Sequence, residues 1–232
     1  KNNPPASTIT LSDGTELRVY PDSDHTLYAL ANGTDLLLEN HPQTPENTMA
    51  VGKKNIDHLE ENTKAAVLAY YEERGRLYDI MEELEKASAI YQQSQNKENF
   101  SMMRIEQNVY PTAANDRLIF FQTSLHLPLA EKTFTERNLC EVFDRKTGAY
   151  IPIEDLFICP LEELGSQLLA LAHLSDADRA DMEAAFRREY IFFTEDSLCI
   201  DFPAGSLTNY KEQYIVCLLY TSPSPRDGLL SR

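Results

Sequence analysis

The sequence predicts an α+β protein: an antiparallel sheet with packed helices, preceded by a small β meander. Turn-forming Asp-Gly and Asn-Gly pairs separate short strand-like runs near the start of the chain, a pattern typical of hairpins. A long stretch with apolar residues three and four positions apart follows, and strand-like runs then return around two shorter helical stretches. Strands before helices, and strands again after them, are the order of an α+β fold.

The meander is expected within residues 7–39, where TITL, ELRVY, TLYAL and DLLLE alternate with turns. Asp13-Gly14 and Asn32-Gly33 suit type I′ turns, because glycine accepts the positive φ that these turns require. The polar stretch at 39–48 contains two prolines and is interpreted as a linker. Residues 1–48 are therefore assigned to a meander with its linker, and the meander is a candidate for the end of a longer β domain upstream.

A long amphipathic helix is predicted over residues 54–95. Asn55 is positioned to cap its start, and Gly75 predicts a kink or a break, since glycine in a helix interior costs about 1 kcal/mol relative to alanine. The spacing also suits a coiled coil, but Thr63 and Glu73 interrupt the apolar seam, which favours a helix packed on a sheet. The apolar positions of the stripe are Ile56, Leu59, Ala66, Tyr70, Leu77, Ile80, Leu84, Ala87 and Tyr91.

Strand-like runs return at 102–112, 116–130 and 139–157. Two helices are then expected over 161–172 and 175–190, the second with Asp176 and Asp178 in its first turn, where the positive end of the helix dipole favours them. A hairpin at 190–202 and a strand at 210–216 close the pattern. Residues 49–216 are therefore assigned to one α+β domain.

Composition excludes several classes of protein. The 232 residues carry a formal net charge of −16, and such a chain repels nucleic acid, whose recognition needs clustered Lys and Arg. It attracts basic proteins instead. No run approaches the ~18 apolar residues of a transmembrane helix. The start, KNNPPAST, has neither an initiator Met nor an apolar signal core, so we expect any membrane anchor or leader to lie in a missing N-terminal segment.

The cysteines and the catalytic templates point away from an enzyme. Cys140, Cys159, Cys199 and Cys217 form no C-x-x-C pair and are interpreted as small buried thiols, with a Cys140–Cys159 bridge left open. Motifs for a nucleophilic serine, a phosphate-binding loop, a dinucleotide site and a zinc protease are all missing. Asp22 to Asp24 resembles the opening of a calcium loop, but the later ligand positions do not match. The five histidines, which stand singly, are His25, His41, His58, His126 and His173. We therefore predict no catalytic residue, no metal site and no cofactor.

Aromatic residues gather near the C-terminal strands, at Tyr190, Phe202, Tyr210 and Tyr214. Core packing and cross-strand pairs are the favoured interpretation. The functional alternative is a surface patch for a protein partner, because tyrosine is enriched at interface hot spots. The residues predicted for this partner-binding role are Asn209, Tyr210 and Tyr214.

A second motif lies in VFDRKTGAYIPIEDLF, at residues 142–157. Together with FFTEDSLCIDF and a tyrosine-rich last strand, it makes residues 100–216 resemble the C-terminal extracytoplasmic domain of the lysozyme-sensing anti-sigma-V factor. Similar domains occur in some cell-wall polysaccharide deacetylases and in other envelope proteins of Gram-positive bacteria. The matching residues are Phe143, Asp144, Thr147, Gly148, Asp155, Leu156 and Phe157.

These matching residues also have a local, structural interpretation. Asp144 to Gly148 suit a tight turn with glycine at a positive φ, and Leu156 and Phe157 are expected to anchor the next loop in the core. One departure concerns residues 127–138: the family often has a Gly-Gly-Ala-His-like stretch where this chain has LPLAEKTFTERN. A partner contact made there does not carry over.

The end of the chain has a different resemblance. CLLYTSPSPRD, residues 217–227, resembles the translation of a transposase adapter used in shotgun library preparation, with all eleven residues matching codon by codon. We therefore expect residues 217–232 to be a non-native tail and the natural chain to reach Val216.

The resemblance implies a non-catalytic binding or sensing domain outside the cytoplasm, at the bacterial cell envelope, that recognises a cationic protein in the manner of an anti-sigma factor. Two alternatives stay open. One is an accessory domain of a cell-wall enzyme of the polysaccharide deacetylase type, and the other is a cytoplasmic scaffold that uses the long helix.

Overall fold

The computed structural model describes residues 4–45, 59–194 and 196–219. Its helices and strands confirm the α+β class. The chain forms two compact units. Unit 1 comprises residues 1–43, 74–108 and 124–137, and unit 2 comprises residues 44–73, 109–123 and 138–232. None of the helices in the described part of the chain combines the length and the apolar character needed to cross a bilayer.

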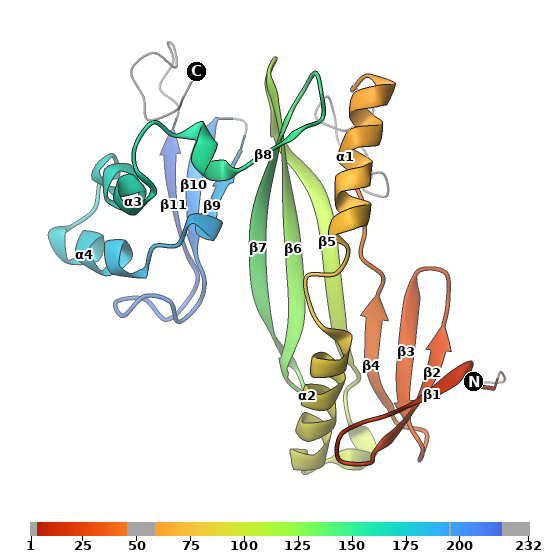
Figure 1. Ribbon diagram of the computed structural model, residues 1–232. Helices are drawn as coiled ribbons and strands as arrows, with labels where there is room; N and C mark the ends of the chain where they lie inside the picture. The colour runs from red at the N-terminus through yellow and green to blue at the C-terminus, as the bar shows by residue number, and fades with distance from the viewer. Residues whose placement is uncertain (1–3, 46–58, 195, 220–232) are drawn as a thin grey trace. The chain divides into compact units, whose positions relative to one another are not determined.

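The strands of the main sheet are hydrogen-bonded in the order β1 to β8 (Figure 1). The prediction of a purely antiparallel sheet is wrong, because β4 pairs with β5 in parallel, with Leu37 opposite Met103 and Glu39 opposite Ile105. The helices Glu61–Arg74 and Ile80–Gln93 lie between β4 and β5 in the sequence, and such a crossover is what a parallel pair needs. The strands are β1 Ser7–Thr10, β2 Glu16–Pro21, β3 His25–Leu30, β4 Asp35–Asn40, β5 Met103–Ala114, β6 Leu118–Ala130, β7 Thr133–Asp144 and β8 Tyr150–Ile151.

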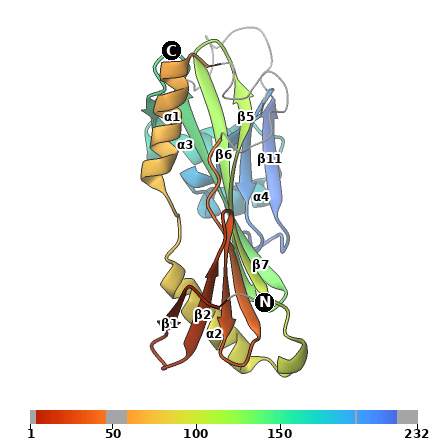
Figure 2. The same ribbon diagram turned by 90° about the vertical axis from the view of Figure 1, so that its right-hand side faces the viewer.

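The meander is present, but it belongs to a larger unit. Strands β1 to β4 pair antiparallel in succession, and α2 (Ile80–Gln93) packs on them (Figure 2). This arrangement differs from the predicted division after residue 48, because the apolar face of the meander needs α2 and the start of β5 to cover it. The buried side chains of this core include Leu17, Leu36, Leu37, Leu84, Ala87, Met103 and Ile105.

The predicted long helix is two helices. α1 spans Glu61–Arg74 and α2 spans Ile80–Gln93, and Gly75 between them has φ +60°, a backbone conformation that ends a right-handed helix. Asp79 begins α2, since its carboxylate accepts hydrogen bonds from the backbone N–H of Met81 at 2.7 Å and of Glu82 at 3.2 Å. The predicted start at Asn55 and Ile56 lies outside the described residues.

Two buried polar side chains hold the connection between the helices in unit 1. Gln107 donates to the carbonyl of Gly75 at 2.9 Å and accepts from the N–H of Leu77 at 2.8 Å. Glu39, which is fully buried, accepts from the hydroxyls of Tyr28 at 2.8 Å and Tyr78 at 2.7 Å. A side chain from the same connection, Arg76, places its Nε 2.8 Å from Glu39. Burial together with the neighbouring Glu39 carboxylate raises the pKa of both tyrosines, so both remain hydrogen-bond donors.

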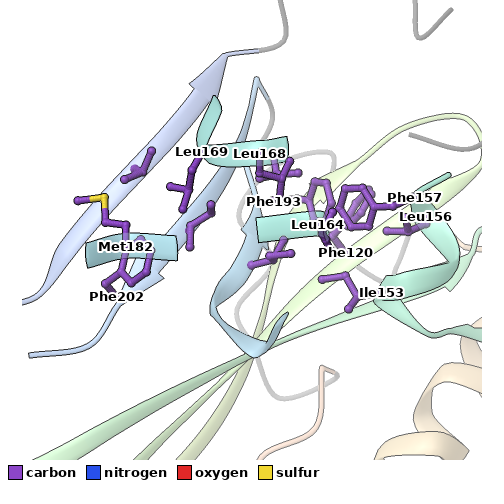
Figure 3. Close-up of a cluster of buried hydrophobic side chains, with 14 of the residues drawn as sticks. Phe120, Ile153, Leu156, Phe157, Leu164, Leu168, Leu169, Met182, Phe193 and Phe202 are labelled. Carbon is purple, nitrogen blue, oxygen red and sulfur yellow. The ribbon is translucent and has the colours of Figure 1, made fainter. Parts of the chain in front are cut away.

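Unit 2 has its core between a second sheet and two helices. α3 (Leu161–Ala170) and α4 (Asp176–Ala185) pack with a three-stranded sheet in the order β11-β10-β9. Figure 3 shows this core, in which the rings of Phe120 and Phe193 lie 4.6 Å apart. The strands are β9 Ile191–Phe193, β10 Ser197–Phe202 and β11 Tyr214–Leu219.

The Phe-Asp-x-x-Thr-Gly motif forms the turn on which α1 packs. Phe143 is fully buried, and the Asp144 carboxylate accepts from Thr147 through both its N–H, at 2.8 Å, and its hydroxyl, at 2.9 Å. These bonds lower the pKa of Asp144. Gly148 has φ +71°, and Thr63 of α1 donates to the carbonyl of Lys146 at 2.7 Å. The motif thus positions a helix that is distant in sequence.

The second part of the motif lies in a short 3-10 turn over Ile153–Leu156. Leu156 and Phe157 are buried in the core of unit 2, beside Ile153 (Figure 3). Asp155 is exposed, and its backbone N–H donates to the carbonyl of Pro152 at 2.9 Å. Each of these contacts serves the packing of this segment.

The cysteines differ from the expectation. Cys199 and Cys217 face each other across β10 and β11 and form a disulfide, whereas Cys140 and Cys159 are free, so the bridge left open between them does not form. Burial raises the pKa of the Cys140 thiol to about 12, which keeps it protonated and unreactive at neutral pH. Cys217 belongs to the stretch that resembles adapter sequence, so the disulfide carries no argument about the compartment of the natural protein.

Substituting Gly148 by alanine should destabilise unit 2. A Cβ at this position would lie 2.6 Å from the carbonyl oxygen of Thr63 and 2.7 Å from the Cβ of Ala66. Gly14→Ala is the matched control, because Gly14 also has a positive φ, +85°, but nothing lies within 4 Å of its Cβ position. Both variants carry the left-handed penalty of about 1–2 kcal/mol, and we expect Gly148→Ala to lose about 1–3 kcal/mol more through overpacking. Equal unfolding free energies in urea denaturation would contradict the contact with α1.

Substituting Tyr78 by phenylalanine should lower the free energy of unfolding of unit 1 by about 1.5–3 kcal/mol, the range for a hydrogen bond to a charged group. The substitution removes the donor to the buried Glu39 carboxylate and keeps the ring. Tyr20→Phe is the control, since no hydrogen bond of the Tyr20 hydroxyl exists within the described part of unit 1. Chemical denaturation of the two variants side by side measures the difference, and a similar stability of both would show that Glu39 does not need this donor.

Candidate partner-binding site

Across residues 4–45, 59–194 and 196–219, no three His, Cys, Asp or Glu side chains gather closely enough to hold a metal ion. The predicted partner-binding residues lie instead on unit 2, at the loop between β10 and β11. Asn209 is exposed, while Tyr210 and Tyr214 are half-buried.

Asp181 of α4 anchors this loop. Its carboxylate accepts from the N–H of Thr208 at 2.9 Å, from the Thr208 hydroxyl at 2.6 Å and from the N–H of Asn209 at 2.9 Å. The Thr208 hydroxyl and the Asn209 N–H are the leading causes that lower the pKa of Asp181. A carboxylate with three donors fixes the backbone of the loop immediately before Tyr210.

Asp178, one turn earlier on α4, lies against the same loop. Its carboxylate accepts from the Ser175 hydroxyl at 2.6 Å and from the Asn209 side-chain amide at 3.4 Å. Ser175 also caps α4 by accepting from the N–H of Asp178 at 3.2 Å. Desolvation raises the pKa of Tyr210, and the neighbouring Asp178 carboxylate adds to the shift.

The two tyrosines form a pair at the end of the loop. Their ring centroids lie 4.4 Å apart with an interplanar angle of 39°. Tyr214 begins β11 opposite Phe202, and the preceding residue, Gln213, donates twice to Asp201, at 2.7 and 2.9 Å. The pair is therefore held from both sides, by α4 and by β10.

The site combines tyrosine rings with the carboxylates of Asp178 and Asp181. Rings and carboxylates both attract ammonium and guanidinium groups, so the arrangement suits a Lys-rich or Arg-rich surface. The sequence pattern predicted a binding role for Asn209, Tyr210 and Tyr214, but it did not predict that Asp181 anchors their loop. The sequence signal that could have pointed to Asp181 is its i, i+3 spacing from Asp178, which places both carboxylates on one face of a helix.

Acid should release the loop from α4. Because Asp181 has a lowered pKa in the folded protein, its contribution is complete above the ordinary aspartate pKa of 3.8 and is lost as pH falls through the lower folded value. We expect the amide protons of Thr208 and Asn209 to lose protection against hydrogen exchange in that range. Asp181→Ala should remove the protection already at neutral pH. Asp176→Ala, a change at an exposed aspartate of the same helix, is the control and should retain it; protection unchanged in Asp181→Ala would contradict the anchoring role.

Comparisons with known proteins bear on the fold. No family model matches the sequence, and no curated protein does. Among solved structures, a member of the DUF3298 family from Bacteroides fragilis NCTC 9343 is similar, with a TM-score of 0.51 and 10% identity over 93% of this chain and 94% of that chain. A DUF3298 protein from Pseudomonas aeruginosa PAO1 covers 94% of this chain and 92% of its own at 12% identity, but its TM-score of 0.39 is too low to carry an argument. At 10% identity, the first likeness shows a shared fold and nothing further.

Proposed function

We propose that this protein is a non-catalytic binding domain at the bacterial cell envelope, outside the cytoplasm, which recognises a cationic protein through the loop between β10 and β11. The observation that carries the proposal is the ring pair of Tyr210 and Tyr214 at the end of a loop that the α4 carboxylate of Asp181 holds in place. A loop that is already ordered loses little entropy on binding, which favours its use as a contact surface.

The charge of the chain supports a cationic partner. A formal charge of −16 attracts basic proteins over long distances and accelerates their encounter at low ionic strength. The resemblance of residues 100–216 to the lysozyme-sensing anti-sigma-V domain supports both the location and the type of partner. Lysozyme is cationic and therefore serves as the first probe.

Binding of lysozyme to the wild-type chain and to Tyr210→Ala/Tyr214→Ala tests the proposal by calorimetry at low salt. We expect saturable binding by the wild type and an affinity lower by tenfold or more in the double variant, because loss of a hot-spot aromatic costs about 2 kcal/mol or more. Phe134→Ala is the matched control, since it removes an exposed ring, 58% accessible, from unit 1.

Three outcomes would oppose the proposal. The first is no saturable binding of lysozyme, and the second is equal affinity in the wild type and the double variant. The third is an equal loss in Phe134→Ala, which would place the contact elsewhere. Raising the salt concentration should weaken a genuine interaction, because screening reduces the attraction between exposed charges.

A further inference from the structure

A groove of about 260 Å³ lies on unit 1, on one face of β5, β6 and β7. Two of its lining residues, Arg104 and Glu106, alternate along β5 with the buried Met103 and Ile105, so these two side chains project away from the core that α2 covers. Figure 1 shows the three strands running side by side. Its lining includes Arg104, Glu106, His126, Lys132 and Phe134.

Phe134 forms an aromatic wall of the groove. Its ring stacks on the imidazole of His126, with centroids 4.8 Å apart and an interplanar angle of 28°. The side chain is nevertheless 58% exposed, so one face of the ring is covered by His126 and much of the remaining ring surface is open. An open ring above a groove offers a flat apolar surface for a second planar group.

Glu106 supplies negative charge beside this wall. One carboxylate oxygen lies 3.9 Å from His126 Nδ1, and the other accepts a long hydrogen bond of 3.4 Å from the Asn40 amide. Both distances are too long for strong bonds. A second glutamate in the lining, Glu131, is already engaged, since it accepts from the Ser94 hydroxyl and the Ser101 N–H, each at 3.1 Å.

Positive charge comes from Arg104 and Lys132. Neither side chain makes an ion pair or a hydrogen bond with any residue in the described part of the chain. This is notable in a protein with 37 acidic and 21 basic side chains, where carboxylate partners are plentiful. Arg104 and Glu106 are two residues apart on one strand and therefore project on the same face. The groove thus presents both signs of charge next to one aromatic ring.

From this arrangement we infer that the groove binds a free α-amino acid with a planar side chain. The ammonium group pairs with Glu106, the carboxylate pairs with Arg104 and Lys132, and the side chain stacks on the open surface of Phe134. The size agrees, because 260 Å³ lies below the ~300–1,000 Å³ of pockets for drug-sized ligands. This site is separate from the loop between β10 and β11, and its existence does not depend on the proposed function.

NMR titration of the complete chain with three probes tests the inference. One probe is an amino acid, and each of the other two lacks one of its charged groups. They are L-phenylalanine, 2-phenylethylamine, which lacks the carboxylate, and 3-phenylpropionate, which lacks the ammonium group. We expect saturable binding of L-phenylalanine and about tenfold weaker binding of each analogue, the loss expected for one charge-assisted contact.

Two single variants separate the contacts. Arg104→Gln should weaken L-phenylalanine and 3-phenylpropionate but leave 2-phenylethylamine unchanged, whereas Glu106→Gln should weaken L-phenylalanine and 2-phenylethylamine but leave 3-phenylpropionate unchanged. Phe134→Ala should weaken all three probes, and Tyr210→Ala on unit 2 should weaken none. Unchanged melting temperatures identify the variants that remain folded.

The inference is overturned if L-phenylalanine shows no saturable shifts, or if shifts occur away from β5 to β7. It is also overturned if the three probes bind equally, or if the two charge variants affect all probes alike. Lysozyme binding to the same samples reports on the other site, so a failure here and a failure of the proposed function are distinguishable.

Discussion

β4 and β5 pair in parallel over residues 37–39 and 103–105, and a parallel pair cannot be closed by a tight turn. The chain must leave the sheet after β4 and return beside it in the same direction. The segment that does so contains α1 and α2, separated at Gly75. Glu39 and Gln107, which hold the connection between these helices, lie on the two paired strands themselves. The two strands whose parallel pairing requires a crossover therefore also carry Glu39 and Gln107, the side chains that hold the connection between α1 and α2 in place.

Carboxylates have two roles in this acidic protein. Some are structural anchors: the fully buried Glu39 holds a helix connection, and at the surface Asp144 holds a turn and Asp181 holds the loop before Tyr210. Glu39 replaces bonds to water by bonds from two tyrosine hydroxyls and by a contact with Arg76, which offsets the penalty of burying its charge. The surface carboxylates, Asp181 among them, also add to the excess of negative charge, which acts at long range on basic partners.

The two candidate sites use aromatic rings differently. In unit 2, Tyr210 and Tyr214 contact each other and lie beside Asp178, which suits a cationic surface. In unit 1, Phe134 contacts a histidine and lies among charges of both signs, which suits a small dipolar molecule. The fold similarity to a DUF3298 protein at 10% identity does not choose between these uses, because a shared fold leaves the side chains at a site undetermined.

Several elements could be predicted from local sequence patterns alone. The Asp-Gly and Asn-Gly hairpins, the interruption at Gly75, the turn at Asp144 to Gly148 and the acidic first turn of α4 each follow from the backbone preferences of a few adjacent residues. Other features became visible only in the folded chain. β4 pairs with β5 in parallel, and Thr63 donates a hydrogen bond to the turn before Gly148. Asp181 accepts a hydrogen bond from Thr208, and one groove is lined by Arg104, Glu106 and Phe134. These contacts join residues that are distant in the chain or lie on different strands. No periodicity within one segment specifies them, because they depend on strand register and on how the packed core orients each element.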